Sequence, residues 1–330
     1  MEQRKLMMVL PLLLVLTVAV RGINGMICDG LEGLCDLRID QVTFPGTHNA
    51  GSDSSIVSDT CLYRNHLSDM SGQFCGGVRY FDIDTCWHGG KVINCHCGPV
   101  GNCRYGEDMS VTLSKLDAVV KCIAPDYCNK VLILNFNHNA NGDKEMIGKG
   151  LETILTNLWD PNGNSELKMS TYFKRNNQWP TLREAIESKQ RIFVFMDTGP
   201  ASYIQPQPDW LQLTNDFITT TYALMIVWSS GGCTFIVDEA RSKCDTSASF
   251  IELSAFSTLG ACADTRARIC SEDNAIGVAM EACHSKREQY DKVVNFLSVD
   301  YAVDSIGYDT QSVVDRARTM NERNIQKFNP

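Results

Sequence analysis

Several features are missing from this chain of 330 residues, and each absence narrows what the protein can be. No N-x-[ST] sequon is present, so N-glycosylation is not expected. No G-x-G-x-x-G run follows a predicted strand, which leaves a dinucleotide-binding fold without support. Internal repeats, low-complexity tracts and long linkers are also lacking, and this favours one folded domain.

Basic residues are fewer than acidic residues. The chain carries 30 Lys and Arg residues against 39 Asp and Glu residues, a formal net charge of −9. An acidic surface repels the phosphate backbone of nucleic acids and gives no electrostatic attraction to anionic membranes. A nucleic-acid partner is therefore not expected.

Long apolar runs are scarce as well, and the one near the N-terminus has a specific layout. Arg4 and Lys5 precede an apolar run from Leu6 to Val20, and small residues follow it. This order of segments is typical of a secretory signal peptide, and the run is short for a membrane span. We therefore predict a signal peptide over residues 1–25, a single catalytic domain over residues 26–330 and an extracellular location.

Cysteine, in contrast, is abundant: the chain has 15, and all of them follow the apolar run. Secreted domains rich in cysteine are usually stapled by disulfides, so most of these residues should pair. The odd count leaves at least one thiol free or bonded to another chain. The short spacings favour local pairs within three groups, namely Cys28 with Cys35, the cluster Cys86, Cys95, Cys97 and Cys103, and Cys122 with Cys128.

Short β-rich runs alternate with helical patterns along the whole chain. Alternation of this kind is typical of parallel strands joined by helical crossovers. At this length a (β/α)8 TIM-type barrel fits better than an open sheet, so we predict an α/β barrel, regular or distorted, with disulfide-stapled loops. The predicted strands cover residues 41–46, 77–84, 130–138, 191–197, 222–228, 250–256 and 293–302, and the predicted helices cover 110–123, 146–159, 181–190 and 310–323.

Polar side chains gather where the first three predicted strands end. In chain order these residues are His48, Asn49, Asp82, Asp84, Asn135 and Asn137. Side chains two positions apart on a strand point the same way, and in a barrel the carboxyl ends of the strands hold the chemistry. Carboxylate and amide oxygens suit Ca²⁺ or Mg²⁺ better than zinc, so a hard-cation site is predicted there.

Histidines near this cluster indicate proton transfer. Imidazole titrates close to neutral pH, so two histidines can serve as base and acid, and a divalent cation beside them suits displacement at phosphorus. His96 is the predicted partner of His48. His88 is interpreted as structural, His66 as a surface residue and His138 as facing away from the cluster.

Each of these residues also has an ordinary structural explanation. A strand-end aspartate often caps a helix, and asparagines there usually form turns. The prediction depends on several such residues falling at successive strand ends. Zinc ligation by Cys95, His96 and Cys97 is disfavoured, because thiols in a secreted protein should be oxidised.

The motifs that carry these residues resemble those of the phosphatidylinositol-specific phospholipase C X-domain-like phosphodiesterases. The segments "FPGTHNAGS" (44–52) and "GVRYFDIDTCW" (77–87) are similar to the motifs that hold the first histidine and the paired acids of that family. "NCHCGP" (94–99) lies where a second histidine is expected. "WPTLREAIESKQRIFVFMD" (179–197) and "VVNFLSVDYA" (293–302) are similar to later segments of its secreted, fungal-type members.

The resemblance implies a distorted barrel and a two-histidine mechanism, with His48 and His96 as the catalytic pair. Carried over in the same way, the metal ligands for Ca²⁺ or Mg²⁺ are Asn49, Asp82, Asp84 and Asn137. Asn137 stands where metal-dependent members usually have a glutamate, and an amide there removes a full charge from the ligand set. The resemblance does not identify the residues that bind the headgroup. Asp197 at a strand end and Tyr301 after Asp300 are candidate headgroup contacts by position, and core packing is the alternative for Tyr301.

Together these features predict a secreted phosphoric diester hydrolase of phospholipase C type. The resemblance alone implies a phosphoinositide-like lipid as substrate, with inositol-based lipid anchors and lysophospholipids as alternatives. The loop 202–210 is interpreted either as a peripheral membrane contact or as an ordinary rigid surface loop. Two alternatives stay open. One is a catalytically silent barrel that binds a headgroup or a protein, which the amide of Asn137 favours. The other is a sphingomyelinase-D-like phosphodiesterase, which the P-G-T-H-N motif and the late strand "FLSVDY" (296–301) oppose.

Overall fold

The computed structural model describes residues 26–53, 64–97, 102–121, 129–138, 143–227, 233–236, 242–257, 272–300 and 313–329. Of the segments 222–227, 233–236, 255–257 and 272–276 it describes the backbone alone. Three predicted features lie outside the described residues, namely the signal peptide over 1–25, the pair Cys122 and Cys128, and Tyr301.

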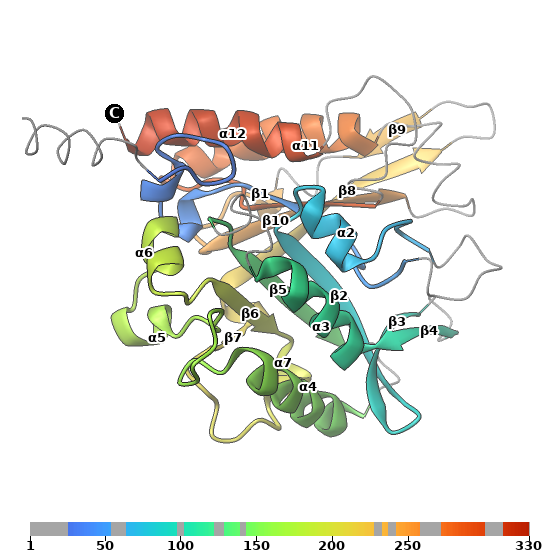
Figure 1. The fold of residues 1–330 in the computed structure, drawn as a ribbon. Coiled ribbons are helices and arrows are strands. Elements are labelled where there is room, and N and C mark those ends of the chain that lie inside the picture. The colour runs from blue at the N-terminus through green and yellow to red at the C-terminus, as the bar shows by residue number, and fades with distance from the viewer. Residues whose placement is uncertain are drawn as a thin grey trace, which may run out of the picture.

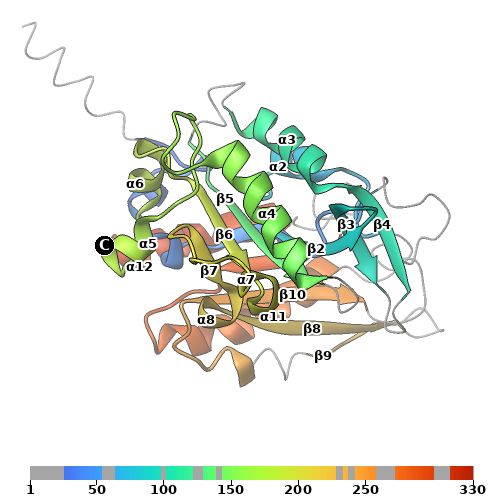
Figure 2. The ribbon, with the colours of Figure 1, turned by 90° about the horizontal axis from the view of Figure 1, so that it is seen from below.

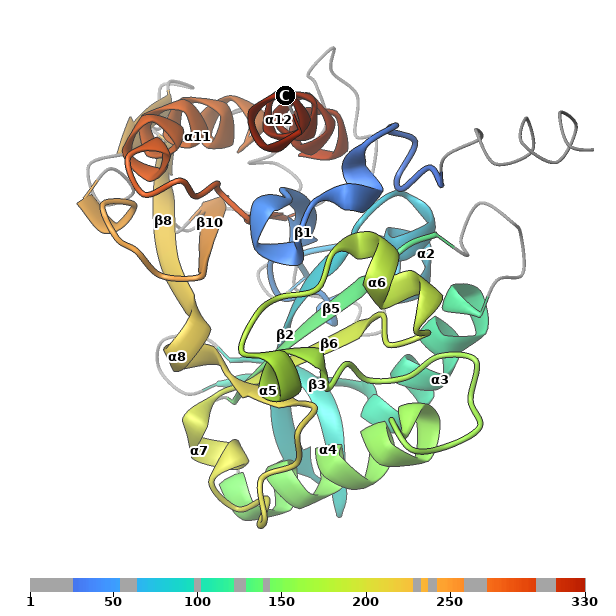
Figure 3. The same ribbon diagram turned by 90° about the vertical axis from the view of Figure 1, so that its left-hand side faces the viewer.

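Eight parallel strands of the described chain curve into the sheet that frames the molecule (Figure 1, Figure 3). Their order across the sheet is β7-β6-β5-β2-β1-β11-β10-β8. Their bounds are β1 Phe44–Thr47, β2 Tyr80–His88, β5 Leu132–His138, β6 Ile192–Met196, β7 Leu211–Leu213, β8 Ile218–Val227, β10 Phe250–Ser257 and β11 Phe296–Val299. No pairing joins β7 to β8 in the described residues, so the predicted α/β barrel is confirmed in a distorted, half-open form.

A three-stranded antiparallel extension grows from the end of β2. Residues 85–88 pair with β3 (Lys91–Cys97), and β3 pairs in turn with β4 (Cys103–Asp108). Gly89 and Gly90 form the tight turn with φ of +59° and +79°, which glycine adopts without steric cost. The extension brings His96 alongside the strand that carries the paired aspartates. A further strand, β9 (Cys233–Ile236), pairs antiparallel with β8.

Helices cover the outer face of the sheet. Figure 2 shows α3 and α4 together on the side of β5, with α11 on the opposite side of the molecule. The helices are α2 Met70–Cys75, α3 Met109–Val120, α4 Lys144–Trp159, α5 Tyr172–Asn176, α6 Leu182–Glu187, α7 Thr198–Ala201, α8 Thr214–Phe217, α11 Glu272–Glu288 and α12 Val313–Phe328, with 3₁₀ turns η1 Leu34–Asp36 and η2 Ile39–Gln41. The four helices predicted from the sequence correspond to α3, α4, α6 and α12 within a few residues.

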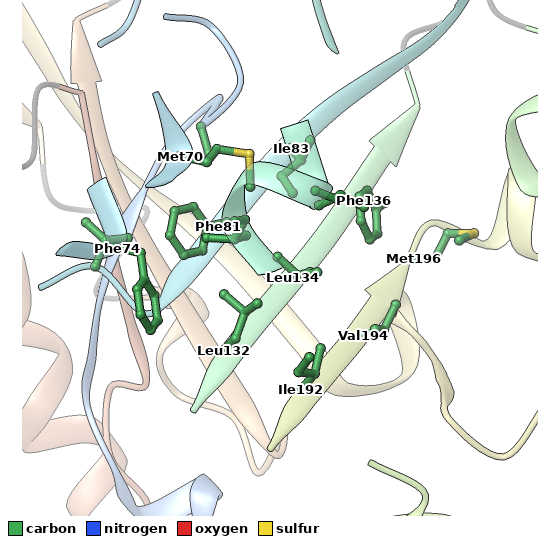
Figure 4. Packing of buried hydrophobic residues seen from close by; sticks show 14 of the residues in the cluster. Met70, Phe74, Phe81, Ile83, Leu132, Leu134, Phe136, Ile192, Val194 and Met196 are labelled. Carbon is green, nitrogen blue, oxygen red and sulfur yellow. The ribbon is translucent and has the colours of Figure 1, made fainter. Parts of the chain in front are cut away.

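Side chains that face outward from the strands are apolar and pack under these helices. Alternate residues of a strand point to opposite faces, so each strand supplies every second residue to this layer. Members of the layer on three neighbouring strands are Phe81, Ile83, Leu132, Leu134, Phe136, Ile192, Val194 and Met196 (Figure 4). Each such buried side chain stabilises the fold by about 1.5–3 kcal/mol.

Side chains that face the barrel interior change in character along the barrel axis. Near the amino ends of the strands they are aromatic: the ring centroid of Tyr80 lies 4.1 Å from that of Phe296, and the ring of Phe250 lies 4.7 Å from Trp179. Toward the carboxyl ends they become polar, as in β10, where Glu252 follows Phe250 on the inward face. The interior therefore has an apolar floor and a polar upper half in which a site can form.

Disulfides staple the chain, and the short-range pairs among them confirm the prediction from cysteine spacing, whereas the pair Cys244–Cys283 was not predicted. The described pairs are Cys28–Cys35, Cys86–Cys95, Cys97–Cys103 and Cys244–Cys283. Cys75 is an exposed free thiol. In the part of the chain that the structure describes, none of the helices has the length and apolar character needed to cross a membrane.

Candidate active site

A histidine–carboxylate pair lies at the carboxyl ends of two neighbouring strands. His48 directly follows β1 and Asp300 directly follows β11, and the register of these parallel strands pairs Thr47 with Val299. As a result Nδ1 of His48 lies 3.0 Å from Oδ1 of Asp300. Asn65 steadies the carboxylate, because its Nδ2 donates to the same Oδ1 at 2.7 Å.

This pair sets the protonation of His48. Burial by itself lowers the pKa of His48, but the hydrogen bond and charge of Asp300, with the charges of Asp82 and Asp84, raise it to about 9. Burial raises the pKa of Asp300 and the bond from His48 lowers it, and the net direction is downward. In the metal-free protein the two groups therefore form an ion pair at neutral pH.

The paired aspartates of β2 face the same interior. Asp82 lies opposite Asn135 of β5 in the register of the parallel strands, and Asp84 lies opposite Asn137. The amide of Asn137 donates a hydrogen bond to Oδ1 of Asp82, and Nδ2 of Asn135 lies 3.3 Å from the same oxygen. The structure thus brings the predicted oxygen-rich side chains together.

Further negative charge lies close to Asp82. Burial raises the pKa of Asp82 well above its usual value, and the nearby charges of Glu252 and Asp84 raise it further, while His48 opposes them. A cation among these oxygens would relieve that repulsion. The donor set of two carboxylates and two amides fits Ca²⁺ or Mg²⁺, although both described amides at Asp82 present their NH₂ groups to it.

His96 approaches the cluster from the antiparallel extension. Its Nε2 lies 3.5 Å from Nδ2 of Asn49, the residue that follows His48. Asn49 has φ of +49°, a left-handed conformation that asparagine tolerates better than most residues. The disulfides of Cys95 and Cys97 flank His96 on both sides and hold its segment in place.

Sulfur does not provide a second metal centre here. The sulfur atoms of Cys86, Cys97 and Cys103 lie within 4.8 Å of one another. All three are engaged in disulfides, and thiolates rather than disulfides ligate metals. The interpretation of the Cys95–Cys97 run as disulfide-bonded therefore agrees with the structure.

Several residues lie elsewhere than the sequence indicated, or were missed. His66 was predicted at the surface, but it is fully buried and its Nε2 lies 2.8 Å from the carbonyl oxygen of His48. That prediction was wrong because the polar neighbours of His66 in the sequence give no indication of its tertiary contact.

Asp300 was missed as a site residue. The signal was available, because it ends the strand "FLSV" just as Asp84 lies near the end of its own barrel strand.

Asp197, a predicted headgroup contact, lies apart from His48 in its hydrogen bonding. Asp197 accepts hydrogen bonds from the backbone N–H and from Nδ1 of His138, at 3.1 and 2.9 Å, where β5 and β6 end. This pairing agrees with the prediction that His138 faces away from the cluster. His88 stacks on Tyr105 with ring centroids 4.0 Å apart, as a structural residue would. Tyr301 lies outside the described residues.

The fold and this arrangement define a class: α/β barrels, incompletely closed, with a polar site at the carboxyl ends of the parallel strands. A family model described as PI-PLC X 1 matches residues 34–207, just over half of the chain. The chain therefore belongs to the PI-PLC X family, and this supports a phosphodiesterase of that type. No curated protein matches the chain.

Solved structures of bacterial enzymes share the fold. Phosphatidylinositol-specific phospholipase C from Listeria monocytogenes superposes with a TM-score of 0.57 at 13% identity, over 89% of this chain and 97% of that one. A fluorophenylalanine-containing form of the Staphylococcus aureus enzyme gives 0.52 at 14% identity, over 88% and 94%. A second S. aureus structure gives 0.51 at 15% identity, over the same shares. At such identities the similarity establishes the fold alone.

Proposed function

We propose that this protein is a secreted phosphoric diester hydrolase of phospholipase C type, with His48 and His96 as its catalytic pair. The observation that carries the proposal is the contact of His48 with Asp300 together with the approach of His96 to the side chain of Asn49, the residue next to His48. Two imidazoles at one phosphodiester can act on its attacking and leaving oxygens. Four disulfides in the described residues support secretion.

The proposed reaction is an internal displacement at phosphorus. In molecules whose His48 imidazole is neutral, Nε2 accepts the proton of a substrate hydroxyl next to the phosphodiester while the hydroxyl oxygen forms a bond to phosphorus. Because the pKa of His48 is raised to about 9, this neutral form is the minority at neutral pH when no cation is bound. The bond from phosphorus to the lipid alcohol breaks, and His96 gives that leaving oxygen a proton. Asp300 holds Nδ1 of His48, which fixes the ring and stabilises the imidazolium that forms. The products are the free lipid alcohol and a cyclic phosphate.

Asn49, Asp82, Asp84 and Asn137 would hold a divalent cation, Ca²⁺ or Mg²⁺. When bound, such a cation supplies neutralisation of charge on the phosphoryl oxygens. A phosphoinositide-like lipid is the proposed substrate, because an inositol ring carries the adjacent hydroxyl that the reaction needs. Peripheral membrane contact is proposed at Tyr203, which is 45% exposed, whereas Trp210 of the same loop is buried.

The decisive experiment is turnover of a chromogenic inositol phosphodiester by purified protein, with and without added Ca²⁺ and with a chelator control. We expect cation-dependent turnover that His48→Ala or His96→Ala reduces by about 10²–10⁴-fold. Circular dichroism and thermal unfolding would establish that both variants keep the fold. Full activity in the double-alanine variant would rule the mechanism out.

The second candidate is a silent barrel that binds a headgroup. It is favoured by the amide of Asn137, which leaves the β5 wall of the cluster without a carboxylate. A panel of lipids assayed for both binding and cleavage separates the two: binding without cleavage of any member, in the presence of Ca²⁺ or Mg²⁺, identifies the silent barrel.

A further inference from the structure

The turn that follows β1 lies along one face of β3, in the antiparallel extension. Two contacts join them: Nδ2 of Asn49 lies 3.5 Å from Nε2 of His96, and Gly51 lies against the side chain of Asn94. Residues two apart on a strand point to the same face, so Asn94 and His96 both project toward the turn. The turn that begins at His48 is thus connected at two places to the strand that carries His96.

The second contact leaves no room for a side chain on Gly51. A Cβ atom placed on this glycine would lie 2.5 Å from Cγ of Asn94 and 3.0 Å from its Cβ, and closer still to its Oδ1. Carbon atoms in contact prefer a separation of about 3.5–4.0 Å. Rotation of the Asn94 side chain would relieve only part of the overlap, because its Cβ atom stays in place. Either the turn or β3 would therefore have to move.

The turn is held by its own hydrogen bonds. The backbone N–H of Ala50 donates to the carbonyl oxygen of Asp82 at 2.7 Å, and the carbonyl oxygen of Ala50 accepts from Nε2 of Gln73 at 2.9 Å. The N–H of Ser52 donates to the carbonyl oxygen of Asn49 at 2.8 Å and closes the turn. A larger side chain in the turn should consequently displace β3 rather than the turn itself.

Asn94 is held from its other side by α3. Its Nδ2 donates to Oγ1 of Thr112 at 2.8 Å, and Oγ1 of Thr112 donates to Oε2 of Glu107 at 3.1 Å. A carboxylate oxygen only accepts, so the hydroxyl hydrogen of Thr112 points to Glu107, and Asn94 presents its amino group to Thr112. Its carbonyl oxygen Oδ1 is then the atom that faces Gly51. The side chain of Asn94, which is buried, therefore fills the space between α3 and the turn.

We propose that Gly51 and Asn94 are positioning residues whose contact sets how closely His96 approaches His48. Gly51 allows β3 to lie close to the turn, and the side chain of Asn94, backed by Thr112, keeps β3 from moving closer. The inference rests on the proposed function, because there the two histidines act on one phosphodiester. It assigns the spacing of that pair to two residues that take no part in the proposed proton transfers.

The first test is the turnover of Gly51→Ala, which should displace β3 and His96 with it. A misplacement of about 1 Å in a reacting group can cost about 10²-fold in rate, so kcat should fall by about 10²-fold. KM should change little, because the lost interaction belongs to the transition state. Activity is measured with the chromogenic inositol phosphodiester, and thermal unfolding checks that the variant is folded.

Gly148→Ala is the matched control. A Cβ atom on this buried glycine of α4 would lie 3.1 Å from the carbonyl carbon of Pro200 in α7, and closer still to its oxygen. The substitution therefore overpacks a part of the fold away from His96, and it should lower Tm as Gly51→Ala does. Its kcat should stay near that of the unaltered protein. An equal loss of kcat in the two variants would overturn the inference.

A double variant tests whether the effect passes through Asn94. The three atoms nearest to a Cβ on Gly51 all belong to Asn94, and Asn94→Gly removes them. In that background Gly51→Ala should have no further effect on kcat, because its methyl group enters the vacated space. Asn94→Gly by itself should lower kcat less than Gly51→Ala does, since it opens the contact without overpacking it. Additive losses in the double variant would overturn the inference.

A further measurement needs no turnover. In chelator-treated protein labelled with ¹⁵N-histidine and held at one pH, the ring signals of His96 are assigned by their loss in His96→Ala. Gly51→Ala should move these signals and leave those of His138, which is bonded to Asp197, in place. Gly148→Ala should leave the signals of His96 in place.

These measurements separate the inference from the proposed function. If the unaltered protein cleaves no phosphodiester while the signals of His96 move as expected, the proposed function fails and the positioning of His96 by Gly51 and Asn94 stands. Should Gly51→Ala fail to fold, Asn94→Gly gives the same reading, because it alters the same contact. Unmoved signals of His96 in either folded variant would overturn the inference.

Discussion

Oδ1 of Asp300 lies 3.0 Å from Nδ1 of His48, although 252 residues separate the two along the chain. Each is the first residue beyond its strand, and the strands β1 and β11 are parallel neighbours in register. The contact raises the pKa of His48 to about 9 against the opposing effect of burial. The strand register therefore creates a contact that sets the charge of His48, the residue on which the proposed chemistry depends. Several experiments can test this contact.

Asp300→Asn should lower the pKa of His48 from about 9, because the amide removes the charge that stabilises the imidazolium. Turnover should fall by about 10²–10⁴-fold, since the ring also loses its orienting partner. The pKa is measured by NMR titration of His48 in chelator-treated protein, and kcat with the chromogenic substrate. An unchanged His48 titration would contradict the assigned role of Asp300.

The same ion pair predicts how stability depends on pH. The folded pKa of His48 lies above its unfolded value of 6.5, so its contribution is fully present below pH 6.5 and is lost as the pH rises toward about 9. The folded pKa of Asp300 lies below its usual value of 3.8, so its contribution is present above that value and is lost in acid. The shift of His48 corresponds to at most about 3 kcal/mol.

Chemical denaturation at a series of pH values, with chelator present, measures this dependence. The free energy of unfolding should decline between pH 6.5 and 9 in the unaltered protein and decline much less in His48→Ala. Equal slopes in the two proteins would show that another group titrates in this window.

Asn137→Asp should strengthen cation binding several-fold, because it adds a carboxylate to the ligand set. It should also destabilise the metal-free protein, since the amide that donates to Asp82 is replaced by a second negative charge. Ca²⁺ should consequently raise the Tm of this variant more than that of the unaltered protein. Asp84→Asn is the opposite control, with weaker binding expected. Thermal unfolding with and without Ca²⁺ measures the change in Tm of each protein. Equal changes in Tm in all three proteins would show that the cation binds elsewhere.

Removing the disulfide of the His96 segment should impair catalysis more than folding. In Cys97→Ser/Cys103→Ser the segment loses one of the two clamps beside His96, so kcat should fall while most of the stability persists. Cys28→Ser/Cys35→Ser is the matched control, because it opens a loop of similar length far along the chain from His96. Comparable losses of kcat in both variants would indicate a general effect on stability.

Much of the site followed from local patterns in the sequence. Asp82 with Asp84, and Asn135 with Asn137, alternate on their strands with apolar neighbours, and a period of two assigns each pair to one face. The carboxyl ends of parallel strands lie at the same edge of the sheet, so the sequence also groups His48 with these four residues. The structure shows that these residues lie together, and the experiments above test their roles.

Other members of the site depend on contacts that no local pattern records. Glu252 lies in an apolar stretch that predicts a buried strand, and nothing nearby in the sequence indicates the Thr220 hydroxyl that it accepts from. His66 has polar neighbours typical of a surface loop, yet it packs beneath His48. Asp197 ends a strand as the other acids do, but its partner is His138.

The sequence by itself determined the alternation of strands and helices, the disulfide-rich character and the polar residues at the strand ends, because these depend on spacing between neighbours along the chain. It took the tertiary structure to show that β7 and β8 do not pair in the described residues, that Asp300 is the partner of His48, and that Thr220 donates to Glu252. The reason is that strand order and register set which side chains meet inside a barrel, and both are properties of the whole sheet.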